Sequence, residues 1–448
     1  MTQDALRSAL LDARVPRYTS YPPANRFSGA VGPETVEAWM ADLPACADVS
    51  LYVHVPFCRR LCWFCACRTQ GTRTVAPLAA WLDTLEAEVA LVAERLPAGL
   101  RTSALHLGGG TPTLLSSEQI TRLGSVLAPI LNADAETEVA VEIDPCELDE
   151  ARLDALKALG LSRASIGVQD FDPVVQAAIG REQSAEVTGQ AVRWLRERGI
   201  GGINFDLLYG LPHQTEARLA ATLDEALRHR PDRVALFGYA HVPWVSRRQR
   251  LIPEEALPGA EERLALSALA RARLLEAGYV AIGIDHFALP EDSLAVAARE
   301  RRLHRNFQGY TTDGALALIG LGPSAISRYP GGHAQNAPAT GAWTEAIRAG
   351  RLATLRGHAI SPREAMIGDV IERLMCDGRV DLAALARRHD APLERLLLPA
   401  EEAMARLPGV ARIEGTELVV ADFAYARLLA AAYDGGLPGD SGRFSLAS

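Results

Sequence analysis

Between residues 50 and 330 the chain alternates short apolar segments with longer amphipathic ones, and this alternation limits the folds it can adopt. Short β-branched or aromatic runs predict strands, and longer segments with apolar residues three or four apart predict helices. The predicted strands are 50–55, 104–107, 138–143, 163–167, 202–208, 233–239 and 279–283. The predicted helices between them include 77–94, 117–127, 150–159, 184–198 and 216–227. Strands joined through helices run parallel, so we expect an α/β fold whose functional groups gather at the carboxyl ends of the strands.

The two flanks of this α/β region have a different character. Before residue 50 the chain is a polar arm with one expected helix at 33–43. After 350 we expect helices at 361–376, 381–388, 393–407 and 423–433, with a hairpin at 411–420. Helices plus a hairpin are typical of a winged helix, but segment 393–407 carries few basic residues for a DNA groove. We therefore expect an arm at 1–49, an α/β domain at 50–350 and a mostly helical, winged-helix-like domain at 351–448 that covers the open side of the first.

Composition excludes several classes of function. The 448 residues are 48% hydrophobic, enough for a large core, and the formal net charge is −9 with no basic stripe for nucleic acid. No apolar run approaches the roughly 18 to 20 residues that a membrane span requires. Without a signal sequence, clustered cysteines are typical of the reducing cytoplasm. We expect a cytoplasmic protein without nucleic-acid or membrane partners, and nothing in the sequence requires more than a monomer.

Four of the seven cysteines lie in the segment LYVHVPFCRRLCWFCAC at 51–67. Cys58, Cys62 and Cys65 are spaced C-x3-C-x2-C on a loop that follows a predicted strand, and close spacing lets thiolates converge on one metal centre. Zinc usually takes two separated ligand pairs, and no second pair follows here. Disulfides need an oxidising compartment. An iron–sulfur cluster is the favoured interpretation, with zinc as the alternative, and Cys67 is left as a nearby thiol of open role.

Polar or glycine-rich residues also follow the other predicted strands. Segment 108–112, Gly-Gly-Gly-Thr-Pro, comes directly after the second strand, where missing side chains let a ligand approach the backbone. It lacks the Gly-Lys-Ser/Thr ending of a phosphate loop, and a tight turn is the structural alternative. Glu142 ends the third strand, Gln169 follows the fourth and Asp206 lies in the fifth. Each alone is more often a cap or a local ion pair, but together they predict a polar pocket.

The cysteine spacing, with Phe64 before Cys65, resembles the signature of radical S-adenosylmethionine (SAM) enzymes. Further motifs resemble the family of oxygen-independent coproporphyrinogen III oxidases and occur in that family's order. They are RYTSYP (17–22), HLGGGTPT (106–113), EIDP (142–145), GVQDF (167–171), REQ (181–183), DLLYGLP (206–212), YAHVP (239–243), HRNFQGYTT (304–312) and GPSAIS (322–327). Together they cover roughly residues 17 to 327.

This resemblance implies a partial (βα)6 TIM-like barrel that binds a [4Fe–4S] cluster and two molecules of SAM. The implied cluster ligands are Cys58, Cys62 and Cys65. The implied contacts of the cluster-bound SAM are Tyr52, Gly109, Glu142 and Ile326. The implied contacts of the second SAM are Phe64, Gly110, Thr111, Gln169, Arg181, Asp206 and Ala240. No side chain is implied as a catalytic acid or base, and the arm around Arg17 is expected to lie across the mouth of the site.

The resemblance also implies a reaction. A 5′-deoxyadenosyl radical would oxidatively decarboxylate two propionates of coproporphyrinogen III to vinyl groups, giving protoporphyrinogen IX in haem biosynthesis. The electron would come from a donor such as flavodoxin or ferredoxin. Two alternatives remain open: a haem-binding trafficking paralogue, and a radical SAM enzyme that acts on another tetrapyrrole. The RYTSYP arm and Cys67 favour the oxidase.

Overall fold

The computed structural model describes residues 15–435, and its centre is one twelve-stranded sheet in the order β16-β15-β14-β13-β1-β4-β5-β6-β7-β8-β10-β9. β1 (Asp48–Val55) lies between two parallel neighbours, β13 (Ala317–Leu321) and β4 (Arg101–Gly109). Beyond β4 the parallel run continues through β5 (Glu138–Ile143), β6 (Leu161–Gln169), β7 (Gly202–Tyr209) and β8 (Arg233–Gly238). The strand that carries the cysteine loop is therefore supported on both sides.

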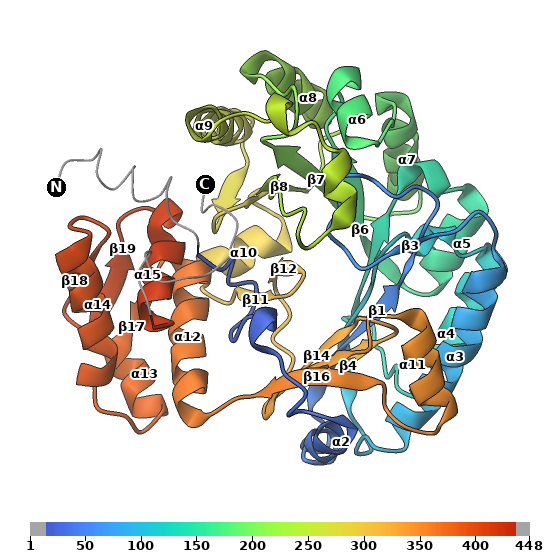
Figure 1. Ribbon diagram of the computed structural model, residues 1–448, viewed down its shortest axis with the longest axis horizontal. Coiled ribbons are helices and arrows are strands. Elements are labelled where there is room, and N and C mark those ends of the chain that lie inside the picture. The colour runs from blue at the N-terminus through green and yellow to red at the C-terminus, as the bar shows by residue number, and fades with distance from the viewer. Residues whose placement is uncertain (1–14, 436–448) are drawn as a thin grey trace.

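Helices cover the outer side of this curved sheet (Figure 1). They are α3 (Ala76–Ala93), α4 (Ser117–Leu127), α5 (Glu150–Ala158), α6 (Pro173–Ile179), α7 (Ala185–Glu197), α8 (Glu216–Arg228) and α9 (Ala260–Glu276). Among residues 15–435 the outermost strands, β16 (Thr354–Ala359) and β9 (Val280–Ile282), do not pair with each other, so the barrel stays open. The predicted α/β partial barrel is confirmed.

The edges of the sheet differ from the sequence prediction. Segment 279–283 was expected as a further parallel strand, but β9 pairs antiparallel with β10 (His286–Ala288), which is itself antiparallel to β8. β13 was not predicted, although it pairs in parallel with β1. From β13 the sheet continues antiparallel through β14 (Ile326–Tyr329) and β15 (Gly332–Asn336) to β16.

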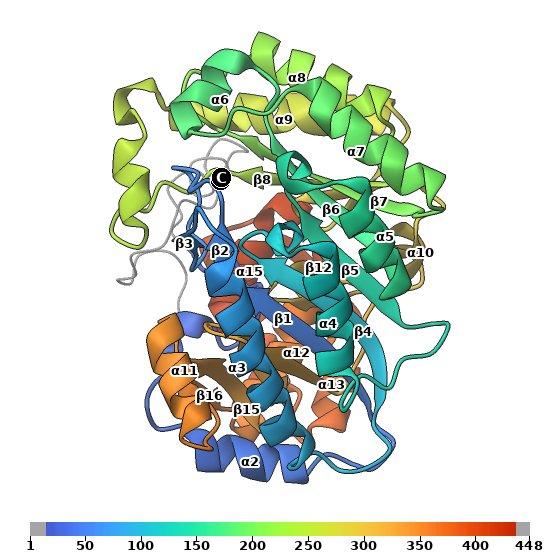
Figure 2. The same cartoon turned by 90° about the vertical axis from the view of Figure 1, so that its right-hand side faces the viewer.

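Side chains along each strand point alternately to the apolar core under the outer helices and to the barrel interior. Leu51, Val53 and Val55 of β1 are fully buried in the apolar core that includes side chains of the outer helices. Because successive side chains of a strand point to opposite faces, the residues between them face the interior. Tyr52 of β1 lies opposite His106 of β4, and their rings stack with centroids 5.8 Å apart. The interior is therefore polar, and Figure 2 shows α3 and α4 against the outer face.

The C-terminal part has an apolar core of its own. Its helices are α12 (Pro362–Asp377), α13 (Leu382–Arg388), α14 (Glu394–Arg406) and α15 (Ala426–Tyr433). Ser361 and Glu364 form a capping box at the start of α12, as the Ser-Pro pair indicated. The predicted hairpin consists of β18 (Ala411–Glu414) and β19 (Glu417–Val420), and the unpredicted β17 (Arg379–Asp381) pairs with β19.

The first described residues of the N-terminal arm pack on this second core. Val15 and Tyr18 are buried in it. Arg427 of α15 donates hydrogen bonds to the carbonyl of Val15 at 2.8 Å and to that of Pro16 at 3.2 Å, and the Tyr18 hydroxyl donates to Asp434 at 3.1 Å. Segments more than 400 positions apart in the sequence thus form one unit.

The division into an arm at 1–49, a barrel at 50–350 and a helical domain at 351–448 remains a proposal. Two separate apolar cores are compatible with it, while helix α2 (Pro33–Ala41) of the arm packs on the barrel core and β16 belongs to the large sheet. Residues 1–14 lie outside the described part of the chain. No helix within 15–435 combines the length and the apolar character that crossing a bilayer demands.

Candidate active site

The cysteine loop leaves the barrel at the carboxyl end of β1. Pro56 ends that strand, and β2 (Phe57–Cys58) pairs in parallel with β3 (Gln70–Gly71), which closes the loop at its base. The Gln70 N–H donates to the Pro56 carbonyl at 2.8 Å. Cys58 and the three cysteines that follow it in the loop all line one cavity of about 260 Å³, which we call the cysteine cavity.

Three side chains at the start of the short 3-10 helix η4 (Arg247–Leu251), which follows β8, hold the loop from outside. The Gln249 amide donates to the Phe64 carbonyl at 2.6 Å, and the Ser246 hydroxyl donates to the Cys65 carbonyl at 2.9 Å. Arg248 donates to the carbonyl of Cys67 at 2.8 Å. The sequence analysis missed these residues, because a helix of five residues is too short to show a periodicity that would reveal their role.

The donor set of the cysteine loop fits an iron–sulfur cluster, since thiolates are the ligands that such clusters take. All seven cysteines are free thiols. Among residues 15–435 no three His, Cys, Asp or Glu side chains lie close enough together to hold a single metal ion. Zinc needs its ligands on one ion, whereas the thiolates of a cluster bind separate irons and stay further apart.

The electrostatics around the cysteines are mixed. A hydrogen bond from the neighbouring Cys67 thiol lowers the pKa of Cys65, while burial raises the pKa of Cys58. The buried Arg181 guanidinium donates to the Cys62 sulfur at 3.5 Å. Hydrogen-bond donors and a fixed positive charge at sulfur favour the thiolate form, which is the form that binds iron.

The glycine turn after β4 lies directly against the base of the cysteine loop. The Gly110 N–H donates to the Val55 carbonyl and the Thr111 N–H to the Phe57 carbonyl, both at 2.8 Å. A side chain at position 110 would collide with the Phe57 carbonyl, and Gly109 has a φ of 104°, in the left-handed region. The triplet therefore forms a tight turn that also exposes backbone to the cavity.

Glu142 at the end of β5 presents its carboxylate to the cavity. Its oxygens accept hydrogen bonds from the Gly109 N–H at 2.9 Å and from the His106 ring at 3.4 Å, and its side chain is 38% exposed. Burial raises the pKa of Glu142, but the His106 hydrogen bond and charge outweigh this and leave the pKa below its usual value. The group is thus an ionised acceptor for a cationic ligand.

Gln169, Arg181 and Asp206 line the cavity beside Glu142, and Gln169 and Asp206 come from the next two strands of the sheet. Gln169 has a φ of 71° where the pairing of β6 with β7 shifts register. Besides its contact with Cys62, Arg181 donates to the Gly167 carbonyl at 2.7 Å. Burial raises the pKa of Asp206 to about 6, although the Ser165 hydroxyl donates to it at 2.9 Å.

Most of the predicted site residues meet in the cysteine cavity. Its lining includes Cys58, Cys62, Phe64, Cys65, Gly109, Gly110, Thr111, Glu142, Gln169, Arg181 and Asp206. Tyr52, Ala240 and Ile326 do not line it. Tyr52 stacks on His106, which donates to the lining residue Glu142. The Ala240 carbonyl accepts from the same Gln249 amide that holds the loop, at 3.2 Å. The roles implied for these residues remain predictions.

The cavity also contains residues that the sequence analysis did not assign. They include Cys67, Asp144, Ser165 and Arg248. Asp144 stands in the EIDP motif at the end of β5 and lies 3.7 Å from Arg181. Position in a motif would have identified Asp144, and strand alternation would have identified Ser165, whereas no signal pointed to Arg248.

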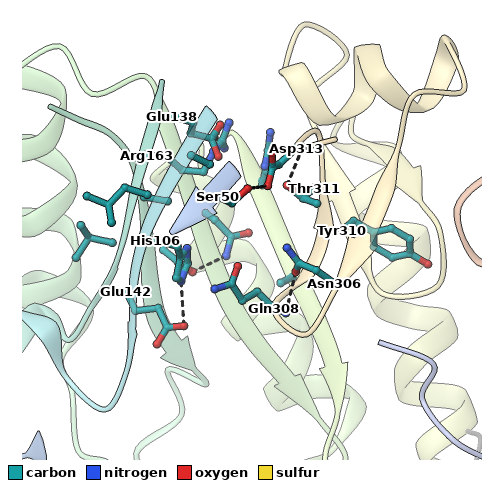
Figure 3. A pocket seen from close by; sticks show the side chains of 18 of the residues that line it. Ser50, His106, Glu138, Glu142, Arg163, Asn306, Gln308, Tyr310, Thr311 and Asp313 are labelled. Carbon is teal, nitrogen blue, oxygen red and sulfur yellow. Dashed lines mark hydrogen bonds and ion pairs between the residues drawn. The ribbon is translucent and has the colours of Figure 1, made fainter. Parts of the chain in front are cut away.

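A second cavity of about 260 Å³ continues into the barrel and shares Glu142, Ser165 and Asp206 with the first. Figure 3 shows its paired polar side chains, among them Glu138 with Arg163, 3.0 Å apart. The hairpin of β11 (His304–Asn306) and β12 (Gly309–Thr311) contributes to its lining. The site is therefore a deep polar interior rather than a surface groove.

The arm reaches the rim of this interior. Arg17 donates to the carbonyl of Gly238, the last residue of β8, at 2.9 Å. This contact places the arm at the carboxyl end of β8. The Arg17 Nη2 atom is bound to the Gly238 backbone and so does not point into the cavity.

Comparisons with known proteins agree with this geometry. The model of the Radical SAM superfamily matches residues 52–226. The chain is 54% identical over 396 residues to an oxygen-independent coproporphyrinogen III oxidase of Paracoccus denitrificans, with 88% of each chain covered. It is 42% identical over 377 residues to the enzyme of that name from Escherichia coli, covering 84% of this chain and 82% of the relative. The solved structure of coproporphyrinogen III oxidase from Escherichia coli, described as a radical SAM enzyme, superposes with a TM-score of 0.89 and 37% identity, covering 94% of this chain and 97% of that one.

Proposed function

The chain belongs to the family of oxygen-independent coproporphyrinogen III oxidases, and we propose that it converts two propionates of coproporphyrinogen III to vinyl groups, giving protoporphyrinogen IX. It is a radical SAM oxidoreductase of haem biosynthesis. The observation that carries the proposal is the gathering of the three spaced cysteines, the glycine turn and Glu142 around one cavity of a fold shared with that family.

Cys58, Cys62 and Cys65 are the proposed ligands of the [4Fe–4S] cluster. When bound, the cluster and SAM supply the 5′-deoxyadenosyl radical that removes a hydrogen atom from a substrate propionate. The chain holds the thiols in place through Ser246 and Gln249, and Arg181 compensates their negative charge.

Glu142 and the backbone at Gly109 are the proposed contacts for the ammonium group of SAM, since an ionised carboxylate binds a cation strongly. Gln169, Arg181 and Asp206 provide polar groups for a second SAM in the same cavity. Enclosure by the sheet and the cysteine loop limits the access of water to the reacting groups. The residues of the chain thus bind, orient and shield, and none of them is proposed as a general acid or base.

Partners and location complete the proposal. The enzyme takes its electron from a donor such as flavodoxin or ferredoxin, functions as a monomer in the cytoplasm, and binds neither nucleic acid nor membrane. The seven free thiols support a reducing compartment, and the net charge of −9 supports the absence of a nucleic-acid partner.

The decisive experiment uses anaerobically reconstituted protein with SAM, coproporphyrinogen III and dithionite. We expect protoporphyrinogen IX, measured by fluorescence after oxidation, together with 5′-deoxyadenosine. Haem binding without turnover would identify a trafficking paralogue instead. Cleavage of another tetrapyrrole, with coproporphyrinogen III untouched, would identify a different radical enzyme.

A further inference from the structure

The cysteine loop and the segment after β8 that holds it are strongly basic in an otherwise acidic chain. Residues 58–75 and 240–251 contain seven arginines and no aspartate or glutamate, whereas the net charge of the whole chain is −9. The arginines are Arg59, Arg60, Arg68, Arg73, Arg247, Arg248 and Arg250. Such a local excess of positive charge attracts anionic partners that the rest of the molecule repels.

The segment after β8 has two functional sides. Its inward residues, Ser246, Arg248 and Gln249, donate to carbonyls of the cysteine loop, as described above. Its outward side exposes large apolar side chains to solvent. They are Trp244, Val245 and Leu251, which are 50%, 55% and 57% exposed.

Exposed arginines accompany these apolar side chains, and two of them line the same groove as Val245. Arg247 and Arg250 belong to the same segment, and Arg68 comes from the cysteine loop. Within residues 15–435 none of the three forms an ion pair with a carboxylate, unlike many other surface arginines of this chain, such as Arg101 with Asp48. The set Trp244, Val245, Leu251, Arg68, Arg247 and Arg250 is called the basic face below.

An open groove of about 660 Å³ connects the basic face to the cysteines. Val245, Arg247 and Arg68 line it together with Cys67, and Cys67 also lines the cysteine cavity. Cys67 and Arg248 line both the groove and the cysteine cavity, so a protein bound in the groove would contact residues of the cavity lining.

We propose that the basic face docks the small acidic electron-transfer protein that reduces the cluster; this proposal rests on the proposed function. An apolar centre with a charged rim is the usual anatomy of a protein interface, and charge complementarity raises the rate of encounter. The hydrogen bond from the Ser246 hydroxyl to the Cys65 carbonyl gives an electron a short covalent and hydrogen-bonded route from the basic face to the thiol of a proposed cluster ligand. With flavodoxin, one electron leaves the flavin hydroquinone, which becomes the semiquinone, and the oxidised cluster gains that electron.

The test reverses the charge of the face. Arg247→Glu with Arg250→Glu is compared with Arg395→Glu and Arg406→Glu on α14, two exposed arginines in the C-terminal part that give the same change in net charge (Figure 1). Binding of an acidic flavodoxin to reconstituted protein is measured at low and high salt. We expect the flavodoxin Kd of the first variant to rise about tenfold or more at low salt, and that of the control to stay near the wild-type value.

A second variant tests the apolar centre. Trp244→Ser with Leu251→Ser should also weaken flavodoxin binding but should leave its salt dependence intact, since the arginines remain. In turnover assays all variants should match the wild type with dithionite, which needs no docking, while the KM for flavodoxin rises in the two face variants only.

Equal flavodoxin binding by the wild type and the Arg247/Arg250 variant would overturn the proposal. So would a higher KM for coproporphyrinogen III with dithionite, because the arginines would then guide the substrate carboxylates. If even the wild type fails to turn over with dithionite, the proposed function fails, and the flavodoxin binding data still decide the docking question on their own.

Discussion

The guanidinium of Arg181 donates a hydrogen bond to the sulfur of Cys62 across 3.5 Å. The two residues are far apart in the chain, and both are buried. A fixed positive charge therefore lies beside a proposed cluster ligand, where it favours whichever redox state of the cluster is more negative.

Replacing Arg181 with glutamine should make the cluster harder to reduce. Loss of the charge destabilises the reduced, more negative state, so the midpoint potential should fall by on the order of 50 mV. A redox titration followed by electron paramagnetic resonance measures this. Arg122→Gln, a surface arginine paired with Asp83 on the outer helices, is the control and should leave the potential unchanged.

Cys62→Ala should abolish cluster assembly while the barrel stays folded. The remaining thiols leave the cluster with too few ligands, but the surrounding strands do not depend on this side chain for pairing. Iron and acid-labile sulfide after reconstitution, with far-ultraviolet circular dichroism, check both parts. Cys46→Ala, which removes an exposed thiol, should retain full iron content. Normal iron in the Cys62 variant would contradict the ligand assignment.

Glu142→Gln should weaken SAM binding by about tenfold to a hundredfold, because a charge-assisted hydrogen bond contributes about 1.5–3 kcal/mol. Equilibrium dialysis with labelled SAM measures the affinity, and iron content should stay normal. Glu138→Gln on the same strand removes a carboxylate that pairs with Arg163 deeper in the barrel. SAM affinity should change little in that control; equal losses in both variants would argue against a direct contact.

Gly110→Ala should destabilise the base of the cysteine loop by about 1–3 kcal/mol, because the new Cβ would collide with backbone carbonyls that cannot move aside cheaply. We expect lower cluster occupancy and a lower unfolding midpoint in urea. Gly201→Ala adds the same methyl group where nothing lies within 4 Å, and it should behave as the wild type. An unaffected Gly110 variant would show that the turn is looser than the structure indicates.

Glu88 should make stability depend on pH. Burial raises its pKa to about 7, although Gly322, Asn336 and Trp343 donate hydrogen bonds to it at 2.7, 2.8 and 3.0 Å. The folded protein therefore binds more protons than the unfolded chain between the ordinary pKa of 4.5 and about 7. The contribution of this group is complete below pH 4.5 and is lost as the pH rises to about 7, on the order of 3 kcal/mol in all.

Urea unfolding of anaerobic protein at pH 5 and pH 8 measures this effect, and Glu88→Gln is the comparison. The variant cannot titrate at this position, so its stability should change less between the two pH values than that of the wild type. Parallel curves for the two proteins would assign the pH dependence to other groups.

The sequence predicted the parts of the site that depend on strand ends. Cys58 and its neighbours, the glycine turn, Glu142 and Asp206 could be placed together because parallel strands bring their carboxyl ends to one edge. Spacing alone located the cysteine loop, and in the structure its four thiols line one cavity.

Local sequence patterns could not predict the features that depend on contacts between distant parts of the chain. β13 is a short run that resembles many buried segments, and only its pairing with β1 identifies it as part of the parallel sheet. Ser246 and Gln249 act through hydrogen bonds to a loop about 180 positions away, and such contacts leave no periodic trace in the sequence. Ile326 was placed by resemblance, and its strand does not contribute to the lining of the cysteine cavity.

The bonds between Arg427 and the carbonyls of Val15 and Pro16 have a consequence for biosynthesis. Val15 leaves the ribosome long before Arg427 has been translated. The arm therefore cannot form its hydrogen bonds with Arg427 while the barrel strands emerge and pair. The arm therefore docks late in folding. In a nascent chain stalled before α15, the sheet would already be formed while the N-terminal arm would not yet be bound.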